Sequence, residues 1–367
     1  MHWYDLQNIA QIDSPAIVLY PDRIKENIQQ LIKMIGDVSR LRPHVKTSKT
    51  AEVVQLMQEA GINKYKCATI AEAEMLGMAG VAEAMLAYQP VGPKIFRLLA
   101  VAQKYPATRF SCLVDNEATA VAIAATFAAQ QLSIPVFMDL NVGMNRTGIK
   151  PGKAALELYT RLHTITGITP VGLHAYDGHI HDTELAVRTE KCVKAFEPVK
   201  ALVQQIKDAG LPAPLVVAGG TPTFSIHAAN EAVDCSPGTF VLWDEGYRQH
   251  IPEQPFQFAA VLITRVIAVI DDQLLCLDLG HKSVAAENPQ PRVFFLNVPA
   301  ATPVSQNEEH LVVRVEDTSL YPVGTVFYGV PYHICPTMAL YEKAYVASDN
   351  TCMANWRIIA RDRSITV

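Results

Sequence analysis

Short β-branched segments alternate with amphipathic segments over roughly the first 220 residues of the chain. Residues 16–20 (AIVLY) are typical of a strand, and residues 23–35 carry isoleucine and leucine at helical spacing. About eight such strand-then-helix pairs follow one another. This alternation predicts a parallel (β/α)8 barrel, an α/β fold with its chemistry on loops at the C-terminal strand ends. A doubly wound sheet is the alternative, and the absence of a GxGxxG motif after the first strand disfavours it.

The pattern changes near residue 245. Runs such as FAAVLITRVIAVI, HLVVRVE and TVFYGV are β-rich, are separated by turns and largely lack helical spacing. They predict a separate all-β domain that closes the chain. The sequence therefore predicts a TIM-like barrel over residues 16–245 and a C-terminal all-β domain over residues 246–367.

Composition narrows the class of protein. Half of the 367 residues are hydrophobic and the net charge is -5, which is typical of a globular chain and gives no basic surface for a nucleic acid. The seven cysteines form no CxxC pair, which disfavours a disulfide framework. The N-terminus lacks a signal-peptide pattern, and no apolar run is long enough to span a membrane. We therefore expect a soluble cytoplasmic protein.

The basic segment RPHVKTSK spans residues 42–49 at the end of a predicted strand. A lysine at such a strand end can lose its solvation, which lowers its pKa and frees the amine to attack an aldehyde. A surface lysine before a helix is the alternative. Composition does not choose between Lys46 and Lys49.

Two glycine-containing loops, GGTPT at residues 219–223 and SPGT at residues 236–239, follow late strands. Adjacent glycines let backbone N–H groups approach an anion, and threonine hydroxyls add donors. Because late barrel loops often bind phosphate, we expect both loops to face one phosphate, with plain turns as the alternative. In the loop NVGMNRTG, Arg146 lies between glycines, where its guanidinium can bind a phenolate or carboxylate or face solvent.

The segment YHICP at residues 332–336 is a candidate metal site. In an extended strand, His333 and Cys335 lie on the same face. Imidazole with thiolate suits zinc better than magnesium or calcium, and two protein ligands leave positions open for a substrate. A core histidine beside a buried thiol is the alternative.

Taken in order, RPHVKTSK, NVGMNRTG, GLHAYDG, GGTPTF, PGTFVLWD, LDLGHK and YHICP resemble the motifs of one enzyme family. The chain resembles the D-threonine aldolase and D-serine dehydratase-like group of fold-type III enzymes, which use pyridoxal 5'-phosphate (PLP) and have the alanine racemase barrel with a β domain. The resemblance covers nearly the whole chain. It also implies that residues 1–15 join the β domain and that the protein is a homodimer.

The resemblance implies roles for individual residues. Lys46 matches the Schiff-base lysine, Arg146 the arginine near the phenolic oxygen of PLP, and Tyr176 the active-site tyrosine. The phosphate cradle corresponds to Gly219, Gly220, Thr221, Gly238 and Thr239. The two ligands of a divalent metal, zinc or manganese, correspond to His333 and Cys335.

The implied activity is that of a PLP- and metal-dependent lyase acting on D-β-hydroxy amino acids. Aldolase-like cleavage of D-threonine to glycine and an aldehyde is the first expectation. Dehydratase-like deamination of D-serine or D-3-hydroxyaspartate to a keto acid and ammonia is the alternative. Cys335 is typical of the zinc-binding dehydratase branch, because the aldolase branch usually has aspartate there and binds manganese. The segment GLHAYDGH is nearer to the aldolase pattern.

Two further points qualify the resemblance. Asp177 stands where an aldolase-like sequence often has histidine, and the nearby His179 and His181 are candidates for the missing base. An amino acid racemase is disfavoured because it needs no metal. A non-enzymatic PLP-binding protein is disfavoured because small barrel-only relatives lack the β domain and the metal pair.

Overall fold

The computed structural model describes residues 1–367, and the chain divides into two compact units. We call them the barrel unit and the sheet unit, and each is described by itself. The barrel unit consists of Leu31–Lys46, Val54–Gly238 and Asp362–Val367. The sheet unit consists of Met1–Gln30, Thr47–Val53 and Thr239–Arg361.

Seven parallel strands form the sheet of the barrel unit, and they pair in sequence order. They are β2 (Lys64–Cys67), β3 (Glu83–Leu86), β4 (Arg109–Val114), β5 (Ile134–Asp139), β6 (Ile168–Ala175), β7 (Leu215–Ala218) and β8 (Val233–Cys235). Residues 41–45 bridge both edges of this sheet, because Leu41 pairs in parallel with Cys235 and His44 with Lys66. This segment supplies the eighth strand position and closes the ring, so the predicted TIM-like fold is confirmed.

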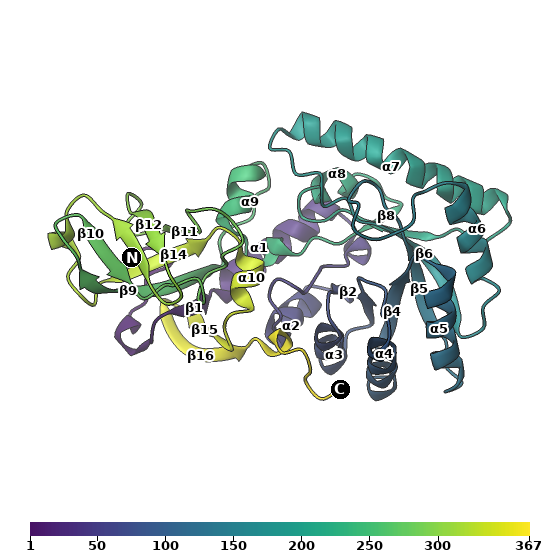
Figure 1. Ribbon diagram of the computed structural model, residues 1–367, viewed down its shortest axis with the longest axis horizontal. Helices are drawn as coiled ribbons and strands as arrows, with labels where there is room; N and C mark the ends of the chain where they lie inside the picture. Colours follow the sequence, from purple (N-terminus) through teal and green to yellow (C-terminus); the bar gives the residue numbers. More distant parts are fainter. The chain divides into compact units, whose positions relative to one another are not determined.

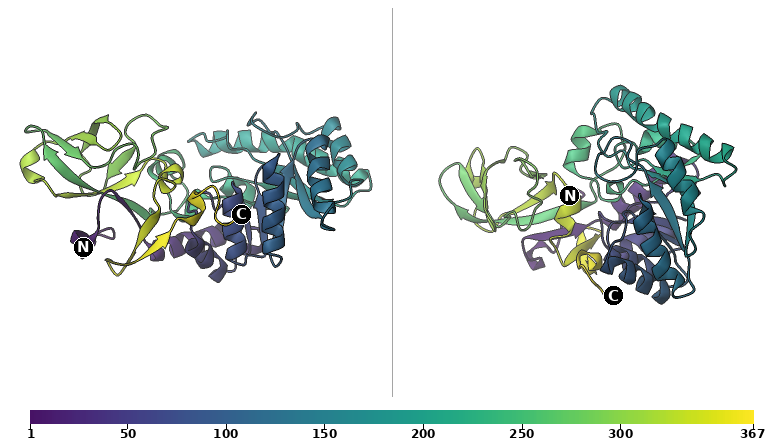
Figure 2. Two further views of the ribbon diagram at one scale, coloured as in Figure 1. Left: turned by 60° about the horizontal axis from the view of Figure 1, so that its bottom comes forward. Right: turned by 45° about the vertical axis from the view of Figure 1, so that its right-hand side comes forward.

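Helices follow the strands and lie on the outer side of the ring, as Figures 1 and 2 show. They are α3 (Ile70–Met78), α4 (Pro93–Lys104), α5 (Glu117–Ala128), α6 (Lys153–Leu162), α7 (Leu185–Asp208) and α8 (Phe224–Ala228). Two more helices, α1 (Pro21–Ile35) and α2 (Ala51–Glu59), have residues in both units. Thr69 and Asn116 cap α3 and α5 by accepting backbone N–H bonds, which fixes where these helices begin. None of the helices has both the length and the apolar character needed to cross a bilayer.

The interior of the ring is layered. Near the strand starts, the buried Arg42 forms ion pairs with Glu83 at 2.9 Å and with Asp234 at 3.5 Å. An apolar layer comes next, made of Met85, Leu113, Phe137 and Val217. Polar side chains lie at the other end, toward the C-terminal ends of the strands. The apolar layer therefore separates a structural charge cluster from the polar face where barrels carry their chemistry.

The sheet unit contains a nine-stranded, mostly antiparallel sheet. Its strands are β1 (Ala16–Leu19), β9 (Ala260–Val269), β10 (Leu274–Leu277), β11 (Val293–Phe295), β12 (Thr302–Gln306), β13 (Leu311–Arg314), β14 (Val326–Pro331), β15 (Lys343–Ser348) and β16 (Thr351–Arg357). The order is β12-β13-β10-β9-β1-β15-β16, and β14 pairs with both β9 and β11. Two short helices, α9 (Glu245–His250) and α10 (Ile334–Met338), complete the unit. The predicted all-β domain is thus present.

The first strand is a correction to the sequence analysis, which placed it in the barrel. Instead, β1 pairs with β9 in antiparallel and with β15 in parallel, inside the sheet unit. All four of its residues are buried. A short apolar run that is buried on both faces has the same pattern in a barrel as in the centre of another sheet, so periodicity could not assign it.

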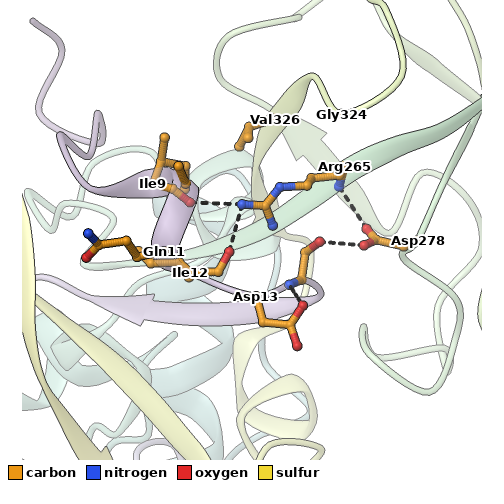
Figure 3. Close-up of a pocket in the computed structure, with 10 residues that line it drawn as sticks. Ile9, Gln11, Ile12, Asp13, Arg265, Asp278, Gly324 and Val326 are labelled. Carbon is orange, nitrogen blue, oxygen red and sulfur yellow. Dashed lines mark hydrogen bonds between the residues drawn. The ribbon is translucent and has the colours of Figure 1, made fainter.

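The N-terminal segment that precedes β1 is fixed to the same sheet (Figure 3). The Arg265 guanidinium donates to the carbonyl oxygens of Ile9 at 2.9 Å and Ile12 at 2.7 Å. The Asp278 carboxylate accepts a hydrogen bond from the Ser14 hydroxyl. These residues line an open hollow of about 730 Å³, and their contacts bind residues 9–14 to β9 and to Asp278, which follows β10.

Candidate active site

The two candidate lysines of the segment RPHVKTSK have different surroundings. Lys46 follows the closing segment of the barrel unit directly, and its backbone N–H donates to His44 Nδ1 at 3.3 Å. Lys49 belongs to the sheet unit, where its carbonyl oxygen accepts from the backbone of Ala360 at 3.2 Å. Of the two lysines, only Lys46 therefore lies at the end of the segment that supplies the eighth strand position of the barrel. Its side chain is exposed, so the desolvation expected from the sequence is not present at Lys46.

The buried lysine of the barrel unit is Lys66, which the sequence analysis did not single out. Its Nζ lies 2.9 Å from His174 Nε2 and 3.0 Å from the Ser236 hydroxyl. Burial, with the positive charge of Lys46 as a second cause, lowers the pKa of Lys66 to about 7. One signal existed in the sequence. Lys66 alternates with the buried Tyr65 and Cys67 in a strand, so its side chain has to point to the opposite face, into the ring.

His174 connects Lys66 to a carboxylate. Its Nδ1 lies 2.7 Å from Asp139 Oδ1 on the neighbouring strand. Burial lowers the pKa of His174, and the charge of Lys66 adds to that effect. Burial opposes ionisation of Asp139, but hydrogen bonds from His174 and Thr147 outweigh it and lower its pKa. The resulting pattern is a neutral imidazole that carries its proton on Nδ1 and presents Nε2 to Lys66.

The ring of Tyr176 contacts the predicted Arg146 and also Lys66. The Arg146 Cζ lies 5.2 Å from the centroid of the Tyr176 ring, and Lys66 Nζ is also 5.2 Å from that centroid. A cation at this distance from an aromatic face is attracted by the ring quadrupole. Two positive groups, the buried Lys66 and the exposed Arg146, thus lie near one aromatic ring.

The two glycine-containing loops contact each other through hydrogen bonds. The Thr221 hydroxyl accepts a hydrogen bond from the Gly238 backbone at 3.2 Å, and the Gly219 carbonyl accepts one from Ser236 at 2.9 Å. A Cβ on Gly220 would lie 2.9 Å from the Tyr176 ring, so a larger residue would intrude on the tyrosine. The backbone can approach closely here, which is the geometry that an anion cradle needs. Thr239 comes next in the chain and is the first residue of the last sheet-unit segment.

A second buried polar cluster of the barrel unit was missed by the sequence analysis. The Asp177 carboxylate contacts His227 Nε2 at 2.8 Å and accepts from the Thr223 hydroxyl at 2.8 Å. Cys192 Sγ lies 3.2 Å from the same His227 nitrogen. The ligand atoms of Asp177, Cys192 and His227 lie within 4.8 Å of one another, so the group could hold a metal ion on geometry alone. Burial raises the pKa of Cys192 to about 12, which favours a neutral thiol.

In the sheet unit, His333 and Cys335 do not lie on an extended strand, and that prediction is wrong. Strand β14 ends at Pro331, His333 is the N-cap of α10, and Cys335 lies in the first helical turn. Pro336 follows in the same turn, where a proline is tolerated because the N–H is unpaired anyway. The helix start nevertheless brings the two side chains close enough to interact.

The His333 and Cys335 pair has an accessible, polar environment. His333 Nδ1 lies 2.5 Å from Glu287 Oε1. Cys335 Sγ lies 3.1 Å from the Thr47 hydroxyl and 3.5 Å from that of Thr239. Burial opposes protonation of His333, but Cys335 and the neighbouring carboxylates outweigh it and raise its pKa to about 9.

Asp244 fixes the helix start that carries this pair. One carboxylate oxygen accepts from the backbone N–H of Ile334 at 3.0 Å, and the other caps α9 by accepting from Tyr247 at 2.9 Å. Burial raises the pKa of Asp244 to about 6. An imidazole and a thiol held side by side form a donor set that suits zinc, so the residues present fit a divalent metal.

Comparison with known proteins matches both parts of the chain. Residues 20–242 match the family described as "Alanine racemase, N-terminal domain", and residues 259–347 match the "Putative serine dehydratase domain". The chain is 28% identical to a D-threonine aldolase from Arthrobacter sp, over 96% of this chain and 94% of the relative. It is 25% identical to the D-threo-3-hydroxyaspartate dehydratase of Delftia sp. (strain HT23), over 95% of this chain and 97% of the relative.

Solved structures agree on the fold. The crystal structure of D-threonine aldolase from Filomicrobium marinum superposes with a TM-score of 0.88 at 24% identity, and the match covers 96% of each chain. The curated relatives are enzymes by name, so the expectation of an enzyme is confirmed, together with the resemblance that the sequence motifs indicated. The chain belongs to the family of the alanine racemase N-terminal domain, with a serine dehydratase-like domain after it.

Proposed function

We propose that this protein is a PLP- and metal-dependent lyase acting on D-β-hydroxy amino acids, with aldolase-like cleavage to glycine and an aldehyde as its reaction. The observation that carries the proposal is the contact between His333 and Cys335 in a chain of the alanine racemase family. A racemase needs no metal. In a lyase, a metal that binds the substrate hydroxyl would help to break the Cα–Cβ bond or to eliminate the hydroxyl group. The aldolase relative supports the choice of reaction.

The residues of the barrel unit, together with Thr239 that follows Gly238 in the chain, fit PLP. Lys46 offers the amine to which the cofactor would attach, and Arg146, over the Tyr176 ring, offers a guanidinium for its phenolic oxygen. The loops containing Gly219, Gly220, Thr221, Gly238 and Thr239 would cradle the phosphate with backbone N–H groups and hydroxyls. When bound, PLP supplies an electron sink for a bond that breaks at the substrate α-carbon.

Two clusters compete as the metal site, and we assign the metal to His333 and Cys335. The Asp177, Cys192 and His227 cluster is buried and its polar atoms already bond to one another. A metal there would be buried with its three ligands. The helix-start pair is partly exposed and leaves coordination positions for a substrate. A thiol ligand favours zinc over manganese.

The chain offers residues that could transfer the protons of the substrate α-carbon and β-hydroxyl. Lys46, once freed, can take or return the proton at the substrate α-carbon. Asp177 is occupied by His227 and Thr223, so it is unsuited to remove the proton of a β-hydroxyl. His179 is the better candidate for that step. It is exposed and packs against Gly143, in the loop that carries Arg146.

A dehydratase is the second candidate, and Cys335 is the observation that favours it. In that reaction Lys46 would remove the α-proton and the hydroxyl would leave with help from the metal. The dehydratase relative, which covers 95% of this chain, supports this alternative.

The test is direct. Purified protein supplied with PLP should show a visible absorption band that Lys46→Ala abolishes and Lys49→Ala retains. A band that survives in Lys46→Ala would overturn the cofactor attachment. Product analysis with D-threonine and D-serine then separates the reactions. Glycine with acetaldehyde indicates an aldolase, and a keto acid with ammonia indicates a dehydratase.

We also propose that the enzyme is a cytoplasmic homodimer. All seven cysteines are free, which is compatible with a reducing compartment. Light scattering of the purified chain measures the oligomeric state, and a monomeric mass would contradict the dimer.

A further inference from the structure

His333 has a carboxylate partner that neither the motif nor the chemistry of the proposed reaction requires. We propose that Glu287 is a positioning residue, which fixes the orientation and tautomer of His333 so that Nε2 is presented to a divalent metal. This inference rests on the metal assignment made in the proposed function. It adds a third residue to the pair that the sequence pattern identified.

The contact itself is short and specific. Glu287 Oε1 lies 2.5 Å from His333 Nδ1, and the Asn288 side-chain amide donates to the same oxygen at 3.0 Å. The side chains of His333 and Glu287 are 40% and 47% exposed. Since neither side chain is enclosed by the core, burial does not force the two together. The hydrogen bond to Glu287, together with the interaction with Cys335, therefore holds the ring.

A second set of bonds attaches the Glu287 loop to the helix that His333 caps. The Thr337 hydroxyl accepts from the Ala285 backbone at 3.1 Å and donates to the His333 carbonyl at 2.8 Å. Thr337 is fully buried. Ala285 is two residues before Glu287, so the threonine fixes the backbone on both sides of the Glu287–His333 contact. The carboxylate is placed by the fold rather than by chance approach of a surface side chain.

The chemistry of imidazole explains what this arrangement does. A neutral histidine has one protonated ring nitrogen and one with a free lone pair, and only the latter binds a metal. A carboxylate at Nδ1 favours the proton there, which leaves Nε2 as the ligand atom. Carboxylate–histidine–metal arrangements of this kind also raise ligand basicity, and loss of the carboxylate typically weakens metal binding by about 10- to 100-fold.

The experiment measures zinc binding to the full-length, PLP-loaded protein by competition with a chromophoric chelator. Glu287→Ala should weaken Zn²⁺ affinity by about 10- to 100-fold. Glu287→Gln keeps an acceptor oxygen without the charge and should lose less. Glu308→Ala is the matched control, because Glu308 is an exposed acid of the same unit that pairs with Lys282. Its Zn²⁺ affinity should equal that of the parent.

Cys335→Ala separates this inference from the metal assignment. If Cys335→Ala binds Zn²⁺ like the parent, the metal site lies elsewhere and both proposals fall. If Cys335→Ala loses Zn²⁺ but Glu287→Ala binds like the parent, only the role of Glu287 is wrong.

A Co²⁺ spectrum tests whether Glu287 is itself a metal ligand. A positioning residue should leave the ligand-field bands of the Co²⁺-loaded protein nearly unchanged in Glu287→Gln. A clear shift of those bands in Glu287→Gln relative to the parent would make Glu287 a direct ligand and overturn the positioning role. Retention of the PLP band and of the circular dichroism spectrum shows that each variant is folded.

Discussion

The Lys66 network and the His333 and Cys335 pair are both built from titratable side chains, but they are organised in opposite ways. Lys66, His174, Asp139 and Ser236 are all at least nine-tenths buried, and hydrogen bonds connect the four side chains in one chain. The His333 side chain is 40% exposed, and its pair is held by a helix start. The closed network is suited to tuning protonation, and the open pair to accepting a ligand.

The largest expected effect tests this contrast through metal content. Cys335→Ala should lose the bound metal, because a two-residue donor set keeps little affinity after loss of its thiolate. Cys192→Ala should retain it, because the Cys192 thiol already bonds within a buried cluster. Elemental analysis of both purified variants gives the result. The reverse outcome would move the metal to Asp177 and His227 and would break the distinction between a closed and an open cluster.

The second prediction concerns the pH dependence of stability. The pKa of Lys66 falls from 10.5 to about 7 on folding, so the unfolded chain binds more protons between these values. The parent should therefore lose stability as pH falls from about 10 to about 7, with the full penalty below pH 7. Lys66→Met lacks this penalty, although it also leaves His174 and Ser236 without their partner. The unfolding free energy of Lys66→Met should thus rise relative to the parent as pH falls through that window.

Thermal or urea unfolding of the two proteins at several pH values measures this difference. Lys282→Met is the control, because Lys282 is exposed and pairs only with Glu308 and Glu309. Its stability difference from the parent should vary little between the same pH values. A Lys66→Met difference that is equally flat would show that Lys66 keeps its charge in the fold.

The same contrast explains what the sequence could predict. The helix at residues 23–35 was recognised from its helical spacing of isoleucine and leucine, and the structure contains it as α1, Pro21–Ile35. The His333 and Cys335 motif was recognisable because two residues near in sequence suffice to define it, although its backbone was predicted as a strand. Local signals thus identified the open pair.

The closed network had no such local signal. Lys66, Asp139 and His174 come from three different strands, and only closure of the ring brings them together. Strand β1 was misplaced for a related reason, since its partners β9 and β15 are more than 240 residues away in the chain. Glu287 is likewise 46 residues from His333. Long-range pairings of this kind cannot be derived from spacing in one sequence.

The smallest predicted effect is the change in unfolding free energy when one serine hydroxyl is removed, either a hydrogen-bonded one or an unbonded one. Ser236→Ala removes a hydroxyl that bonds to Lys66 at 3.0 Å, and it should reduce the unfolding free energy by about 1 kcal/mol. Ser225→Ala is the matched control, because the buried Ser225 hydroxyl has no hydrogen-bond partner. Its removal should be neutral or slightly stabilising, since an unpaired buried polar atom is unfavourable in the fold. Urea unfolding measures the unfolding free energy of both variants. Equal decreases would show that the bond to Lys66 contributes nothing beyond the packing of the serine. The network would then be held by its other contacts alone.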